Sequence, residues 1–124
     1  MSYRKSYVSD YLDRHPFEIS LMISAGVWRF SMLEKDIERK LVVEVKRLGG
    51  LCIKINSASM NGLPDRIILL PDGKVAWCEL KAPGKKPRQL QLKRHKQLTL
   101  LGNKVYVVDS IEKIGGMLSE IYAS

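Results

Sequence analysis

The sequence predicts an α/β protein in which helices flank a mixed four-stranded sheet, in the order α-β-β-β-α-β-α. Three observations support this fold class. Segments with the 3.6-residue period of a helix alternate with short runs rich in apolar and β-branched residues. The letters PDGK join two of these runs, and a proline followed by Asp-Gly is typical of a tight turn. A helical segment separates the third run from the fourth, and strands joined by a crossover helix usually pair in parallel.

Three amphipathic segments predict the helices. The first covers residues 33–48 and has an apolar arc, which consists of Ile37, Leu41, Val42, Val45 and Leu48. The second covers residues 87–101 and carries three leucines on one side, which are Leu90, Leu98 and Leu101. The last helix begins after Asp109, which together with Glu112 resembles a capping box. Each of these helices therefore has one face that a sheet can cover.

Four short apolar runs predict the strands, over residues 51–56, 65–70, 75–81 and 104–109. The turn at residues 71–74 is short enough to make the second and third strands an antiparallel hairpin. The fourth strand follows a helix, so we expect it to pair in parallel with an earlier strand. The predicted sheet is therefore mixed.

Two regions of the sequence differ in pattern and in charge. Residues 1–31 have scattered aromatic side chains and no sustained period, so we interpret them as an N-terminal extension of uncertain role before a domain over residues 32–124. The formal net charge is +8, and the extension supplies only +1 of it, from four basic and three acidic side chains. Residues 82–108 contain seven basic side chains and no acid. A continuous basic stretch favours an anionic partner, and nucleic acid is the commonest one.

Several features of the sequence favour a cytoplasmic protein. No apolar stretch reaches the length that spans a membrane. Acidic residues and Pro16 interrupt the first residues, which is unlike a signal peptide. Cys52 and Cys78 lie inside predicted strands without the spacing of a metal site, and we interpret both as reduced thiols. Reduced cysteines are typical of the cytosol.

An acid pair and a lysine lie at the ends of two predicted strands. Glu79 and Lys81 are two residues apart and therefore point to the same face of the third strand. Asp65 begins the neighbouring strand, and paired strands lie only about 4.8 Å apart. The two carboxylates are thus expected to converge, and oxygen ligands of this kind suit Mg²⁺. The alternative is a surface ion pair of Glu79 with Lys81, with Asp65 stabilising a turn.

The first predicted helix places a third acid near the core. Glu34 and Glu38 both fall within its apolar arc, where a carboxylate costs free energy unless it is paired or binds a metal. Glu34 has an alternative role, because Ser31 three residues earlier forms the spacing of a capping box. Glu38 has no such role. We therefore prefer Glu38 as the functional acid and keep Glu34 as the alternative.

Taken together, these segments resemble a known nuclease motif. The letters PD, followed after thirteen residues by ELK, resemble the PD-(D/E)xK motif, and the branch they resemble is the VRR-NUC domain. The resemblance runs from about Met32 to Leu118 and includes EKDIE, RLGGLCIKI, NGLPDRIILLPDGKVAWCELKAPGKK and LLGNKVYVVDS. It implies a restriction-endonuclease-like core with the predicted mixed sheet.

The resemblance also implies roles for individual residues. The catalytic residues it implies are Glu38, Asp65, Glu79, Lys81 and Gln91. The metal ligands it implies are Asp65, Glu79, the Leu80 carbonyl and Glu38, with Glu34 as the alternative. Gln89 competes with Gln91, which we prefer for its distance from the end of the helix at Gly102. For nucleic-acid binding, the basic run suggests Lys85, Lys86, Arg88, Lys93 and Arg94.

The function that follows is a metal-dependent DNA endonuclease that uses Mg²⁺ or Mn²⁺. Contacts to phosphate carry little sequence information, which fits recognition of DNA structure rather than base sequence. The resemblance to the VRR-NUC domain implies the same, with Holliday junctions or other branched DNA as substrates. Cutting both strands of a symmetric junction needs two sites, which a homodimer would provide. We expect the protein to act in the cytoplasm of a bacterial or phage-infected cell. The alternative is a non-catalytic or RNA-directed nucleic-acid-binding module on the same fold.

Overall fold

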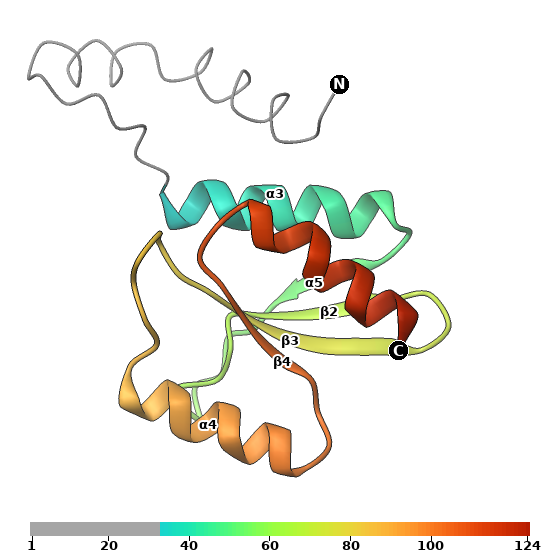
Figure 1. The fold of residues 1–124 in the computed structure, drawn as a ribbon. Coiled ribbons are helices and arrows are strands. Elements are labelled where there is room, and N and C mark those ends of the chain that lie inside the picture. The colour runs from blue at the N-terminus through green and yellow to red at the C-terminus, as the bar shows by residue number, and fades with distance from the viewer. Residues whose placement is uncertain (1–32) are drawn as a thin grey trace, which may run out of the picture. The chain divides into compact units, whose positions relative to one another are not determined.

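The computed structural model describes residues 33–124, which form one unit built on a four-stranded sheet (Figure 1). Two helices cover one face of the sheet and one helix lies on the other. The elements in chain order are α3 (Glu34–Arg47), β1 (Leu51–Lys54), β2 (Arg66–Leu70), β3 (Lys74–Leu80), α4 (Gln89–Leu100), β4 (Val105–Val108) and α5 (Glu112–Ala123). This order and the mixed sheet confirm the predicted fold class. The extension predicted over residues 1–31 lies outside the described residues.

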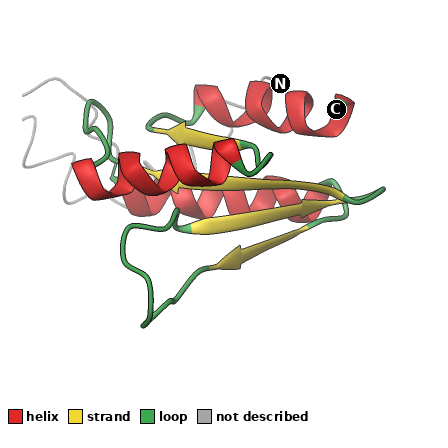
Figure 2. Cartoon of the chain, turned by 90° about the horizontal axis from the view of Figure 1, so that it is seen from below, coloured by secondary structure: helices red, strands yellow, loops and turns green. Residues whose placement is uncertain are grey.

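The strands follow the order β1-β2-β3-β4 across the sheet. β2 pairs with β1 and with β3 in antiparallel fashion, and β4 pairs with β3 in parallel (Figure 2). Both the hairpin and the parallel crossover are therefore confirmed. The hairpin turn has a positive φ at Asp72 (63°) and at Gly73 (72°), which matches the twist of antiparallel strands. Aspartate and glycine tolerate this backbone better than other residues, so the turn chemistry fixes the hairpin.

The hydrophobic core lies between the sheet and the two helices α3 and α5. Its fully buried side chains come from all of these elements, and the largest apolar ones are Ile37, Leu41, Ile68, Leu80, Ile114 and Ile121. Along β2 and β3 every second side chain faces this core, as the alternation of a strand requires. The apolar arc predicted for the first helix is confirmed at Ile37, Leu41 and Val45, whereas Leu48 is exposed beyond the helix end.

The other face of the sheet is covered only in part, by α4. The side chains that α4 buries are Gln91 and His95. Leu90 and Leu101 are 43% and 80% exposed and Leu98 is half-buried, so the leucine side predicted for this helix is not the side that α4 buries. The helix is rotated so that its polar side chains contact Glu79 on β3, a contact that the apolar period could not indicate.

Two predicted helix caps are also wrong. α3 begins at Glu34, and the backbone N–H of Leu33 donates to Oδ2 of Asp36 at 3.1 Å. Asp36, and not Glu34, is therefore the acid that caps this helix. α5 begins at Glu112 after Ile111, and the Asp109 carboxylate instead pairs with Lys113 at 2.7 Å. Across residues 33–124, none of the helices has the length and apolar character needed to cross a membrane.

Candidate active site

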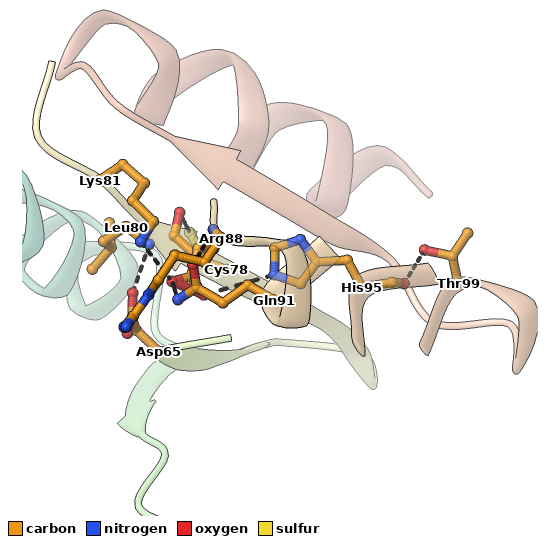
Figure 3. Close-up of polar contacts among 9 residues, drawn as sticks. Asp65, Cys78, Leu80, Lys81, Arg88, Gln91, His95 and Thr99 are labelled. Atoms are coloured by element: carbon orange, nitrogen blue, oxygen red, sulfur yellow. Dashed lines mark hydrogen bonds and ion pairs between the residues drawn. The ribbon is translucent and has the colours of Figure 1, made fainter. Parts of the chain in front are cut away.

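The start of β2 and the end of β3 bring Asp65 and Glu79 together. Arg66 pairs with Cys78 in the sheet, so the same register places Asp65 opposite Glu79. The backbone N–H of Leu80 donates to Oδ2 of Asp65 at 2.8 Å (Figure 3). This bond holds the Asp65 carboxylate against the end of β3. The two acids therefore converge in the structure, as the spacing of paired strands predicts.

Gln91 on α4 orients the Glu79 carboxylate, which is 1% exposed. Its side-chain Nε2 donates to Oε1 of Glu79 at 2.8 Å, while its Oε1 accepts the backbone N–H of Arg88 at 2.8 Å. The amide therefore caps the first turn of α4 and restrains Glu79 with the same side chain. Gln89, the competing glutamine, is exposed at the start of the helix. The structure thus places Gln91 at the acid pair.

Two nitrogen groups lie on either side of the Glu79 carboxylate. Nζ of Lys81 is 3.7 Å from Oε1, and Nε2 of His95 is 3.7 Å from Oε2. Oε2 of Glu79 and Nε2 of His95 are both buried, and neither has a hydrogen-bond partner. His95 is absent from the residues predicted for the site. Its position four residues after Gln91 is the signal that would have found it, because such residues share one face of a helix.

Burial and charge shift the protonation of this cluster. Burial, and then repulsion from Asp65, raise the pKa of Glu79 to about 8, although the Lys81 ammonium opposes the shift. Burial and the Lys81 charge lower the pKa of His95, so the imidazole is neutral near pH 7. Two carboxylates held together without a cation are electrostatically unfavourable, and protonation of Glu79 relieves the repulsion.

The residues of this cluster fit a divalent cation. Their donor set consists of carboxylate oxygens and backbone oxygen, which are the ligands of Mg²⁺ and Mn²⁺. Oε2 of Glu79 is a buried acceptor without a hydrogen bond, as expected for an atom reserved for another ligand. Among residues 33–124, no three Asp, Glu, His or Cys side chains already gather at metal-binding distance. A cation here would use the carboxylates of Asp65 and Glu79, and water, the Leu80 carbonyl or an acid of α3 would complete its shell.

The two acids of α3 have different surroundings. Oε1 of Glu38 is 2.9 Å from Nη2 of Arg66, and Arg66 also donates through Nη1 to the carbonyl of Cys52. Glu34 lies within the field of the acid pair, because partial burial and then repulsion from Asp65 raise its pKa. Sequence reasoning gave Glu38 no partner because Arg66 is 28 residues away along the chain. The metal-binding acid of this helix stays a prediction: Glu38 is paired with Arg66, whereas Glu34 is influenced by the charges of Asp65 and Lys81.

The basic residues predicted to bind nucleic acid divide into two groups. Most are exposed in the loop before α4 or on its outer side, and these are Lys85, Lys86, Arg88 and Lys93. Arg94 instead donates through Nε to the carbonyl of Asn61 at 2.9 Å and through Nη1 to Oε1 of Gln97. Next to Asn61, Gly62 has φ +86°, and a Cβ there would lie 2.9 Å from Leu90. Arg94 therefore ties α4 to the loop that leads into Asp65, in addition to its predicted role.

A mixed sheet with these flanking helices, carrying an Asp–Glu pair and a lysine at the ends of two paired strands, defines the PD-(D/E)xK nuclease class. No protein-family model matches the chain. A protein named "Putative nuclease p44" from Acyrthosiphon pisum secondary endosymbiont phage 1 is 47% identical over 77 residues, which cover 62% of this chain and 83% of that protein. A solved structure described as a VRR_NUC domain has a TM-score of 0.66 and 28% identity, and the match covers 69% of this chain and 94% of the other. The chain belongs to the VRR-NUC domain nuclease family.

Proposed function

We propose that this nuclease is a Mg²⁺- or Mn²⁺-dependent endonuclease that hydrolyses phosphodiester bonds of DNA and selects branched structures such as Holliday junctions. The observation that carries the proposal is the acid pair. Asp65 and Glu79 face one another across two strands, Lys81 lies 3.7 Å from Glu79, and one buried oxygen of Glu79 has no hydrogen-bond partner. This combination suits a site for a cation and a phosphate.

Each residue of the site has a separate task in the proposed reaction. A bound divalent cation would lower the pKa of a water molecule and neutralise charge on the phosphate. Asp65, fixed by the Leu80 N–H, and Glu79, fixed by Gln91, supply the carboxylates that hold the cation. Lys81 places a positive charge beside the attacked phosphate, where negative charge increases in the transition state. We assign the third acid to Glu34, because Glu38 is already paired with Arg66.

The basic surface beside the site supports DNA as the substrate. Lys85, Lys86 and Arg88 are exposed in the segment that leads from Lys81 into α4, and no acid lies between residues 82 and 108. Side chains of this kind contact phosphates and select shape rather than base sequence. The same contacts would suit RNA, and this alternative is one outcome of the test below.

The partly covered face of the sheet supports a homodimer. Leu51 is 63% exposed, and Ile53 and Val75 on the same face are also exposed. Within residues 33–124, β1 pairs with β2 only, so its outer edge is open. A second copy packed against this face would bury the apolar side chains and supply the second active site that a symmetric junction needs. Replacement of Leu51 by Lys should then convert a dimer to a monomer in light scattering; a monomeric wild-type protein would refute the homodimer.

The test of the function is cleavage of labelled junction, flap, duplex and RNA substrates, each with Mg²⁺ and with EDTA. We expect Mg²⁺-dependent cutting that is fastest on branched DNA, and loss of cutting in Asp65→Ala and Glu79→Ala with retained DNA binding. Asp72→Asn is a matched control, because it removes one carboxylate at the far end of the hairpin and asparagine tolerates the positive φ of that turn. Equal cutting in EDTA would refute metal dependence, and preferential cutting of RNA would favour the alternative.

A further inference from the structure

His95 is the one buried group of the site that the proposed reaction has not used. It lies on α4 one helical turn after Gln91, and both side chains point from this helix toward the end of β3 (Figure 3). His95 is 8% exposed, and its Nε2 atom is buried without a hydrogen bond. A buried donor or acceptor in that state costs free energy, so the position needs a physical reason.

The two oxygens of the Glu79 carboxylate differ in their hydrogen bonds, and the one without a partner faces His95. Oε1 accepts a hydrogen bond from Gln91 at 2.8 Å, whereas Oε2 has no hydrogen bond and faces Nε2 of His95 at 3.7 Å. A movement of well under 1 Å would bring that pair into hydrogen-bonding distance. An ionised carboxylate only accepts hydrogen bonds, and it has about four lone-pair positions. Gln91 and His95 would occupy two of them and leave the others to a cation.

The backbone of α4 keeps His95 at this place. The Gln91 side chain caps the helix through the N–H of Arg88, and Arg94 bonds to the carbonyl of Asn61. Gly62 lies close enough to Leu90 that no Cβ fits between them. The helix is thus attached to the loop that leads into Asp65 through Leu90 and Arg94, which precede His95. The imidazole can therefore act on Glu79 without a large change of the helix.

We propose that His95 is a positioning residue for Glu79: the imidazole donates its Nε2–H to Oε2 and, together with Gln91, holds both oxygens of the carboxylate. This inference rests on the proposed metal-dependent function. Ligand carboxylates in metal sites are themselves hydrogen-bonded, and loss of such a partner typically weakens metal binding about 10- to 100-fold. His95 would contact neither the cation nor the DNA, so its effect would appear first in metal affinity.

The experiment compares His95→Gln, which keeps a donor, with His95→Leu, which fills the space without one. Mg²⁺ affinity is measured by titration calorimetry without DNA, and the Mg²⁺ concentration for half-maximal cleavage is measured separately from kcat. We expect His95→Leu to bind Mg²⁺ about 10-fold more weakly, with most of its kcat restored at saturating Mg²⁺. His95→Gln should remain within about 3-fold of wild type, which is the rescue that a hydrogen-bond donor provides.

The control is Thr99→Val, which removes the bond from Oγ1 to the carbonyl of His95 and leaves the imidazole in place. Mg²⁺ affinity should be unchanged in this variant. Equal Mg²⁺ affinity in His95→Leu and wild type would overturn the proposal, as would equal losses in His95→Gln and His95→Leu. If His95→Leu does not fold, His95→Ala takes its place. A 10-fold loss of Mg²⁺ affinity in His95→Ala, with wild-type-like affinity in His95→Gln, supports the proposal. No loss of Mg²⁺ affinity in His95→Ala overturns it. A wild-type protein that cuts DNA equally well in EDTA would overturn the proposed function itself.

Discussion

The protonation of Glu79 predicts that Mg²⁺ binding depends steeply on pH. Burial and repulsion from Asp65 raise the pKa of Glu79 to about 8 in the metal-free protein, whereas a cation requires the ionised carboxylate. At pH 7 only about one tenth of the molecules would have Glu79 ionised. Mg²⁺ binding at pH 7 should therefore release about 0.9 proton, and at pH 9 about 0.1. The apparent affinity should rise about tenfold from pH 6 to pH 7 and level off above pH 8.

The assay is titration calorimetry of the metal-free protein with Mg²⁺ between pH 6 and pH 9. At each pH the titration is repeated in two buffers that differ in ionisation enthalpy, because the difference in heat counts the protons released. Asp72→Asn is again the control and should give the wild-type profile, since its carboxylate lies at the opposite end of the hairpin. An affinity that does not change between pH 6 and pH 8, without proton release, would refute the reasoning, because Glu79 would then be ionised before the metal binds.

The raised pKa of Glu79 also makes the stability of the metal-free protein decrease as pH rises. The folded pKa of Glu79 lies above its model value of 4.5, so the folded, metal-free protein keeps a proton that the unfolded chain loses as pH rises. Stability from this group is full below about pH 4.5 and declines as pH rises toward 8. Glu79→Gln should remove that decline, which thermal melts of the metal-free proteins at pH 5 and pH 8 would measure. A decline equal to that of wild type would contradict the shift.

Three further predictions concern other parts of the molecule. Glu34→Gln should reduce cleavage at least tenfold more than Glu38→Gln if Glu34 reaches the cation, and the reverse ranking in a cleavage assay would return the role to Glu38. Replacement of Lys85, Lys86 and Arg88 together by alanine should reduce the slope of log affinity against log salt by about 3 if each side chain contacts phosphate. An unchanged slope would leave these side chains only a solubilising role. A chain that begins at Met32 should fold and cleave, because the hydrophobic core described here lies within residues 33–124; an unfolded product in circular dichroism would contradict this.

The acid pair follows from features that are local in the sequence. Strand alternation places Glu79 and Lys81 on one face, and the spacing of the hairpin places Asp65 opposite Glu79, so a short segment holds the information for the acid pair. The turn at Asp72 and Gly73 fixes that register through backbone preferences alone. These features follow from neighbours in the chain, and sequence patterns predict them well for that reason.

By itself, the sequence determined the order of elements, the hairpin, the parallel crossover and the acid pair with its lysine. Only the tertiary structure decided the rotation of α4, which turns Gln91 and His95 toward Glu79 and leaves most of its leucines exposed. A prediction from an apolar period assumes that the inner face of a helix is apolar. The inner face of α4 instead carries polar side chains that contact the buried Glu79 carboxylate. The tertiary structure also separated the two acids of α3, because Glu38 meets Arg66 only after the sheet packs against the helix. Contacts between residues far apart in the chain have no local period, so the sequence pattern could not reveal them.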